Sequence, residues 1–227
     1  MQQTSTKAIA KLEDRLGYRF TNVSLLEQAL THRSKQTQNN ERLEYLGDAV
    51  LGFSIAAQLY RQFSSATEGQ LSRCRSSLVK GATLAEIAVD MNIGDYLRLG
   101  PGELKSGGFR RESTLADTFE AIIGAIYLDN GINAADDFIK RCFNEKLFSL
   151  NLNEIQKDPK TQLQELLQAQ KYPVPTYEIV NTQGMEHQQT FFIRCHVSLL
   201  DTPTEGKGGS RRKAEQQAAA VALRLLK

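Results

Sequence analysis

The 227-residue sequence predicts an all-α N-terminal domain followed by a small α+β domain of order α-β-β-β-α. Three observations lead to this prediction. Apolar residues recur at three- and four-residue spacing up to about residue 150, which is the period of amphipathic helices. Alternating apolar and polar residues, which indicate half-buried strands, occur only after residue 172. Between the regions with these two patterns lies a polar stretch, residues 151–157, which predicts a linker between domains at residues 1–150 and 158–227.

The helical period of the first domain is clearest in residues 25–30, 43–59, 78–89 and 115–128, and we expect about seven helices. No run of about 18 apolar residues occurs, so we expect no contact with a membrane. The N-terminus lacks the apolar core of a signal peptide. Three widely spaced cysteines fit neither a zinc site nor a disulfide framework, which favours a reducing, cytoplasmic location.

The second domain begins with a helix start signal. Asp158 is a good N-cap and Pro159 suits the first helical position. Residues 177–180 and 191–197 predict two strands, and a loop is expected at residues 206–209. A last helix from about Ser210 would have one apolar side, formed by Ala214, Ala218, Val221, Ala222 and Leu225.

Two groups of acidic residues suggest a metal site in the first domain. Glu41, Glu44 and Asp48 fall within about 60° of one another on a helix. Asp117 and Glu120 share one face of a helix that is otherwise apolar nearly all round. Buried carboxylates need neutralisation, and no Lys or Arg falls on that face. Hard oxygen ligands on a rigid frame suit Mg²⁺, which supports phosphoryl chemistry.

Simpler interpretations compete with these. Acids on one helix face are commonly solvated surface, and Glu68 can be an ordinary acid at a helix N-terminus. His32 has no second His or Cys nearby, which favours hydrogen bonding over metal ligation. Residues 100–108 resemble a phosphate loop, but Gly108 stands where a lysine is required, which excludes nucleotide hydrolysis. With Lys105, Arg110 and Arg111 this segment is either an RNA-backbone contact or a mobile linker.

The second domain has the charge of a polyanion-binding module. Residues 156–227 carry ten basic and seven acidic residues, whereas residues 1–155 carry 18 and 19. A helix N-terminus with three consecutive cations favours phosphate. A polar face on the domain's opening helix suits 2′-hydroxyls in an RNA minor groove. The alternative is ordinary capping and solvated surface. The candidate RNA-binding residues are Thr161, Gln164, Glu165, Gln168, His187, Ser210, Arg211, Arg212 and Lys213.

These pieces together resemble bacterial ribonuclease III. The stretch from Asn40 to Asp48, NERLEYLGD, is similar to that family's signature. The resemblance continues through residues 29–34, 68–72, 99–112 and 115–120. Residues 158–161 and 208–215 resemble a double-stranded-RNA-binding domain. The resemblance to bacterial ribonuclease III therefore covers nearly the whole chain.

The resemblance implies a double-strand-specific endoribonuclease that leaves 5′-phosphate and 3′-hydroxyl staggered ends. Glu44, Asp48, Asp117 and Glu120 would bind Mg²⁺, with Mn²⁺ as a substitute, and Asp48 and Glu120 would be catalytic. Glu41 and Glu68 match auxiliary acids. A homodimer through the nuclease domain would supply one site for each strand. Processing of ribosomal precursors and messenger RNA is the expected role.

Two rival functions do not involve catalysis. One is an RNA-binding protein with an inactive nuclease fold, but such relatives lose quartet acids and all four are present here. The other is a helical dimerisation module whose function is binding alone. It leaves Asp117 and Glu120 unexplained within an apolar helix. Dependence on Mg²⁺ separates the enzyme from both rivals.

Overall fold

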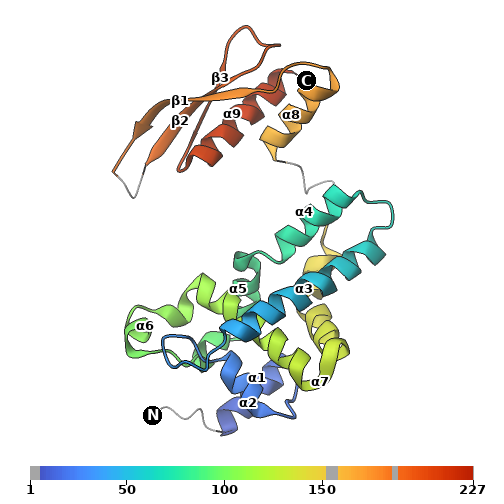
Figure 1. Cartoon of the computed structure of the whole chain (residues 1–227), viewed down its shortest axis with the longest axis vertical. Coiled ribbons are helices and arrows are strands. Elements are labelled where there is room, and N and C mark those ends of the chain that lie inside the picture. The colour runs from blue at the N-terminus through green and yellow to red at the C-terminus, as the bar shows by residue number, and fades with distance from the viewer. Residues whose placement is uncertain (1–5, 152–157, 186–188, 227) are drawn as a thin grey trace. The chain divides into compact units, whose positions relative to one another are not determined.

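The computed structural model describes residues 6–151, 158–185 and 189–226. The chain divides into two compact units, Met1–Ile155 and Gln156–Lys227, and each is described by itself (Figure 1). The linker predicted at residues 151–157 lies almost wholly outside the described residues, so its bounds stay a prediction.

The described part of the first unit is helical, as predicted. Two short 3₁₀ turns, Ile93–Tyr96 and Gly108–Arg110, interrupt the series. Most of the segment with helical periodicity at residues 78–89 lies in α5, whereas Leu78 ends α4 and the chain turns at residues 79–80. The helices are α1 (Thr6–Leu16), α2 (Val23–Ala29), α3 (Glu41–Gln62), α4 (Glu68–Leu78), α5 (Gly81–Asp90), α6 (Pro101–Lys105) and α7 (Glu112–Phe148).

Helix α7 runs through the centre of this unit and is buried along most of its first half. Its side chains Phe119, Ile122 and Ile126 are fully buried, as the apolar composition predicts. The helix breaks at Asn130 and Gly131, whose backbone angles are not helical. The part after the break brings Phe138 and Phe143 back against Phe119, so both parts share one core.

Helices α3 and α7 cross at two glycines. A Cβ atom on Gly47 would lie 1.8 Å from the carbonyl oxygen of Glu120, and one on Gly124 would lie 2.2 Å from that of Leu43. No larger residue fits at either place without moving a backbone. This close approach fixes the distance between the carboxylates that the two helices carry.

The second unit is a three-stranded antiparallel sheet in the order β1-β2-β3, with two helices packed on one face (Figure 1). Leu163, Leu167, Cys195 and Ala218 form its core. A register shift between Ile179 and Asn181 makes a bulge in β1. The elements are α8 (Pro159–Ala169), β1 (Thr176–Gln183), β2 (Thr190–His196), β3 (Thr204–Gly208) and α9 (Arg211–Leu225).

Two details of the second unit correct the sequence prediction. Residues 206–208 are not a loop but the end of β3. Gly206 belongs to the strand because α9 lies directly on it: a Cβ there would be 2.3 Å from the carbonyl oxygen of Ala214. The predicted apolar side of α9 is also wrong at Leu225, which is 62% exposed, whereas Leu223 is buried.

Among the described residues, no helix has both the length and the apolar character that crossing a bilayer requires.

Candidate active site and RNA interface

Three of the predicted ligand residues come together in the first unit. Glu44 of α3 and Asp117 and Glu120 of α7 each offer a carboxylate oxygen, and these oxygens lie within 4.8 Å of one another. All three side chains are half-buried. Glu44 lies in the first turn of α3, while Asp117 and Glu120 stand one turn apart on α7. We call this group the carboxylate cluster.

The pKa values of the carboxylate cluster show that nearby positive charge does not balance its acids. Burial, together with the charges of Asp48, Glu44 and Asp117, raises the pKa of Glu120 to about 8. Burial and neighbouring acids also raise the pKa of Glu44. Burial raises the pKa of Asp117, although His32 and Arg33 oppose the shift. A divalent cation fits this set, since several oxygen ligands on rigid helices are the donors that Mg²⁺ takes.

Asp48 lies beside the carboxylate cluster without being one of its three closely spaced members. Its side chain is exposed, one helical turn beyond Glu44 on α3. Its charge nevertheless reaches Glu120, where it is the strongest electrostatic influence after burial. This is the position of a fourth acid at the open side of the cluster.

The two auxiliary acids have separate surroundings. Glu41 is exposed at the start of α3, 3.5 Å from the guanidinium of Arg33, and it lines the same cleft as Glu44. Glu68 begins α4 and accepts a hydrogen bond at 2.7 Å from Ser72 on its own helix. The structure therefore brings Glu41 to the site, whereas the role of Glu68 stays a prediction.

A cleft of about 490 Å³ opens beside the carboxylate cluster. Its walls are the loop after α2, the start of α3 and the start of α7. Arg111 lines it and pairs with Glu103 of α6. The lining residues are His32, Arg33, Ser34, Asn40, Glu41, Glu44, Glu103, Arg111, Ser113, Thr114 and Asp117.

The contacts of this cleft settle two alternatives. His32 accepts at Nδ1 a hydrogen bond from the backbone N–H of Ser34, 3.1 Å away, so it has the hydrogen-bonding role expected. The mobile-linker interpretation of residues 100–108 is wrong, because they form α6 and the turn that leads to α7. The pair between Arg111 and Glu103 holds this segment against the start of α7.

The second unit presents the predicted polar face of α8. Asp158 caps the helix by accepting from the backbone N–H of Thr161 at 3.1 Å, as predicted. The hydroxyl of Thr161 also donates to Asp158, at 3.0 Å. The four predicted residues of this face, Thr161, Gln164, Glu165 and Gln168, are all exposed. His187 lies outside the described residues.

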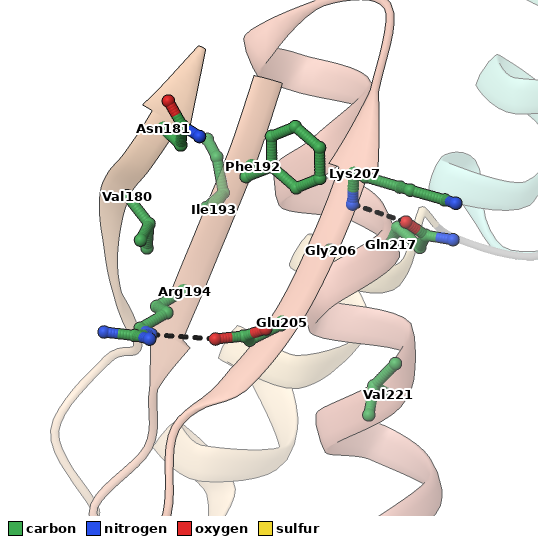
Figure 2. A pocket seen from close by; sticks show the side chains of 10 residues that line it. All are labelled: Val180, Asn181, Phe192, Ile193, Arg194, Glu205, Gly206, Lys207, Gln217 and Val221. Atoms are coloured by element: carbon green, nitrogen blue, oxygen red, sulfur yellow. Dashed lines mark hydrogen bonds and ion pairs between the residues drawn. The ribbon is translucent and has the colours of Figure 1, made fainter. Parts of the chain in front are cut away.

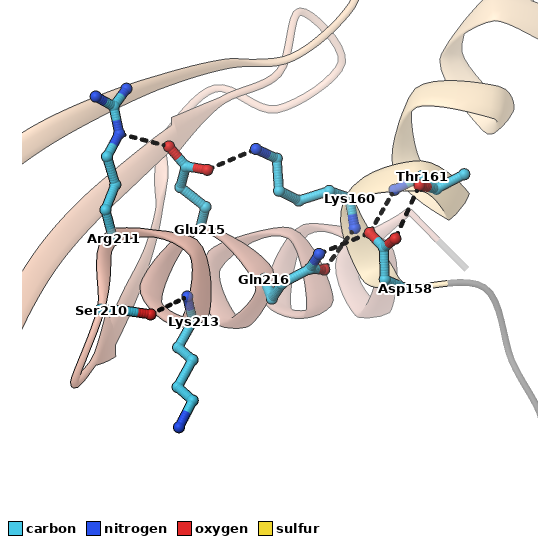
Figure 3. Close-up of polar contacts among 8 residues, drawn as sticks. All are labelled: Asp158, Lys160, Thr161, Ser210, Arg211, Lys213, Glu215 and Gln216. Carbon is cyan, nitrogen blue, oxygen red and sulfur yellow. Dashed lines mark hydrogen bonds and ion pairs between the residues drawn. The ribbon is translucent and has the colours of Figure 1, made fainter. Parts of the chain in front are cut away.

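The basic residues at the start of α9 differ in their surroundings: one is paired with a carboxylate and the others are exposed (Figure 3). Arg211 donates to the buried carboxylate of Glu215 at 2.9 Å, and Lys160 of α8 donates to the other oxygen at 2.6 Å. Burial opposes ionisation of Glu215, but these hydrogen bonds hold its pKa below the ordinary value. Arg212 and Lys213 are exposed, and Ser210 caps the helix through the Lys213 N–H. Sequence reasoning did not foresee that Arg211 pairs with Glu215 on its own helix, or that Lys160 ties α8 to α9 through the same carboxylate.

Comparisons with known proteins match both units. A family model described as Ribonuclease-III-like matches residues 22–147, and one described as Double-stranded RNA binding motif matches residues 159–226. A protein named Ribonuclease 3 from Marinomonas sp. (strain MWYL1) is 55% identical over 216 residues, 95% of each chain. The chain belongs to the ribonuclease III family. A second Ribonuclease 3, from Vibrio cholerae, is 52% identical over 221 residues, which cover 97% of this chain and 98% of the relative.

Solved structures of ribonuclease III agree with the first unit. The nuclease domain from Campylobacter jejuni aligns with a TM-score of 0.60 and 43% identity. The alignment covers 63% of this chain and 99% of that domain. The Campylobacter jejuni structure is described as showing structural flexibility in a region involved in dimer formation of its nuclease domain.

The second unit has a cleft of about 530 Å³ between the sheet and α9 (Figure 2). Its one carboxylate, Glu205, is already paired with Arg194 at 2.9 Å. The backbone N–H of Lys207 donates to the side chain of Gln217. This cleft lacks the neighbouring acids that a metal needs, so the carboxylate cluster of the first unit is the better candidate for ribonuclease III chemistry.

Proposed function

We propose that this chain performs its family's activity, endonucleolytic hydrolysis of double-stranded RNA, as a Mg²⁺-dependent homodimer that leaves 5′-phosphate and 3′-hydroxyl staggered ends. The carboxylate cluster is the observation that carries the proposal. Three acids from two helices converge within 4.8 Å, and burial, together with the charges of Asp48, Glu44 and Asp117, raises the pKa of Glu120 to about 8. Such an arrangement is costly unless a cation balances it.

Glu44, Asp48, Asp117 and Glu120 would hold the metal, with Mn²⁺ as a substitute. When bound, Mg²⁺ would supply Lewis-acid stabilisation of the charge that develops on the phosphodiester. Asp48 and Glu120 orient the attacking water and accept its proton at a carboxylate oxygen. The 2′-hydroxyl is not the nucleophile in this scheme. Glu41 and Glu68 act as auxiliary acids in substrate handling.

The second unit would select the substrate. The exposed polar face of α8, formed by Thr161, Gln164, Glu165 and Gln168, suits 2′-hydroxyls in the shallow minor groove of A-form RNA. Ser210, Arg212 and Lys213 at the start of α9 meet phosphates, where the helix dipole adds to their charge. Arg211 contributes mainly through Glu215, because its guanidinium already pairs with that carboxylate. His187 remains a proposed RNA contact on the sequence pattern alone.

The homodimer would form through the nuclease unit. Tyr45, Phe53 and Tyr60 of α3 are 82%, 63% and 74% exposed, and their spacing places them on one face of the helix. A stripe of exposed aromatic rings is typical of an interaction surface. A two-fold dimer provides one carboxylate cluster for each RNA strand. We extend the proposal to processing of ribosomal precursors and messenger RNA in a reducing cytoplasm, which the three free cysteines allow.

The test is cleavage of a long RNA duplex with and without Mg²⁺. We expect the wild-type protein to cut only with the metal. Glu120→Gln should bind the duplex but cut at least 100-fold more slowly, which is the size of effect that loss of a catalytic group has on rate. Glu145→Gln is the matched control, because Glu145 is exposed near the far end of the same helix. Binding without cleavage by the wild type under any divalent cation would make the chain a binding protein.

A further inference from the structure

Two buried polar side chains in the cleft beside the carboxylate cluster have no role so far. Asn40 is 2% exposed and Thr114 is 4% exposed, and both line the cleft. The backbone N–H of Asn40 donates to the carbonyl oxygen of Thr31 at 2.9 Å, and its carbonyl accepts from the N–H of Glu44 at 2.9 Å. Within the described part of the chain, neither the Asn40 amide nor the Thr114 hydroxyl has a hydrogen-bond partner.

These two groups are out of place in a purely structural role. Among the described residues, the buried side-chain atoms without a partner are Arg73 Nε and Tyr177 Oη, so the polar atoms of Asn40 and Thr114 are open to the cleft that both residues line. Asn40 stands at the N-cap position of α3 but makes no capping hydrogen bond, and the neighbouring Asn39 accepts from the N–H of Glu41 instead. A hydrogen-bonding ligand in the cleft accounts for both side chains.

The chemistry of the cleft indicates what this ligand is. Four carboxylates line it, and its two arginines are engaged, Arg33 with Glu41 and Arg111 with Glu103. A further phosphate would therefore be repelled. An amide and a hydroxyl can each both donate and accept a hydrogen bond, which matches a neutral group that also does both. In RNA, the ribose hydroxyl is that group.

We propose that Asn40 and Thr114 bind a ribose 2′-hydroxyl of the strand that is cut, at the nucleotide next to the scissile phosphate. The inference rests on the proposed function, which brings this strand to Glu44 and Asp117 in the same cleft. It makes the nuclease unit itself selective for ribose, in addition to the selectivity of the RNA-binding unit. Asn40 and Thr114 are then specificity-determining residues.

The test uses RNA duplexes that each carry one 2′-deoxynucleotide, moved stepwise across the cleavage position. Cleavage rates are measured for the wild type, Asn40→Ala and Thr114→Val. The matched control is Thr118→Val, because Thr118 is one turn further along α7, fully buried, and donates its hydroxyl to the backbone of Thr114. Thr114→Val keeps the shape of the side chain, and it carries the test alone if Asn40→Ala does not fold.

We expect the wild type and Thr118→Val to cut one of the deoxy-substituted duplexes on the order of 10-fold more slowly than all-ribose RNA, the effect of one lost hydrogen bond. Asn40→Ala and Thr114→Val should be slower on all-ribose RNA and nearly indifferent to that deoxynucleotide. If they keep the full wild-type sensitivity, or if no position affects the wild type, the inference is overturned. A wild type that cuts no duplex at all overturns the proposed function instead.

Discussion

Individual carboxylates carry the proposed chemistry of this protein, and the energetic cost of burying them is visible in the raised pKa of Glu120. Its pKa of about 8 means that, without metal, the folded protein holds a proton there which the unfolded chain releases near its ordinary value of 4.5. A group whose folded pKa is raised in this way loses stability as the pH rises from about 4.5 to 8. The burial that prepares the site for a cation therefore destabilises the metal-free protein near neutrality.

The first prediction concerns this pH dependence. With metal removed by a chelator, the unfolding free energy of the wild type should fall between pH 5 and pH 8.5. The fall should exceed that of Glu120→Gln by on the order of 2 kcal/mol, a figure that allows for solvent screening. Glu44 and Asp117 add to the same trend in both proteins, because their pKa values are also raised. Urea unfolding followed by circular dichroism measures the difference. Parallel pH profiles for the two proteins would show that Glu120 ionises normally.

The elements that carry the site were predictable from periodicity, whereas their meeting was implied only by the family resemblance. The periodicity of residues 43–59 and 115–128 indicated α3 and α7, and the i, i+3 spacing placed Asp117 and Glu120 on one face. Spacing within a helix does not indicate which other helix it crosses, so without the resemblance the approach of Glu44 to Asp117 and Glu120 could not be predicted. In the structure, Gly47 and Gly124 permit this approach, since each faces a backbone carbonyl of the other helix.

Other features escaped the sequence analysis because their patterns have commoner meanings. Closely spaced glycines such as Gly206 and Gly208 usually mark a loop, but here they let α9 lie directly on a strand. Asn40 before a helix suggests an N-cap, and a threonine in the first turn of a helix, such as Thr114, does not by itself indicate a function. Only the burial of both, and the absence of described partners for them, distinguishes these residues from capping groups. The sequence suggests that Arg211 is a free cation, whereas in the structure its guanidinium donates a hydrogen bond to Glu215.

A prediction at this scale follows from the crossing of α3 and α7. Gly47→Ala should destabilise the protein by several kcal/mol, since its Cβ would lie 1.8 Å from the carbonyl oxygen of Glu120. Gly52→Ala, on the same helix, meets no atom within 4 Å and should be neutral or gain up to about 1 kcal/mol from helix propensity. Thermal unfolding of both variants checks this. Equal stability for both would mean that the helices can separate at no cost.

At the scale of the whole molecule, the proposed activity needs two copies of the chain, since one carboxylate cluster cuts one strand. The face of α3 that bears Tyr45, Phe53 and Tyr60 lies on the same helix as Glu44 and Asp48. An interface on this helix would set the two clusters at a fixed separation. The stagger of the product ends would then be a property of the dimer and not of either chain.

The prediction is that Phe53→Asp gives a folded monomer that no longer makes double-strand cuts. Light scattering after gel filtration measures the mass, and a labelled duplex distinguishes single-strand nicks from double cuts. Val89→Asp is the matched control, because Val89 is 57% exposed on α5 and should tolerate the charge. A Phe53→Asp protein that remains a dimer would place the interface elsewhere.

The pairing of Lys207 with Gln217 has a consequence for solubility. An exposed edge strand invites another chain to add to the sheet, which is a route to aggregation. Along β3, the side chain of Gln217 already accepts a hydrogen bond from the backbone N–H of Lys207 at 2.5 Å, and α9 lies directly against Gly206. At the opposite edge, the bulge between Ile179 and Asn181 breaks the register that an incoming strand would need. A small sheet with both edges obstructed would resist strand addition at the high local concentration that the proposed dimer, bound to a long RNA, would create for its binding units.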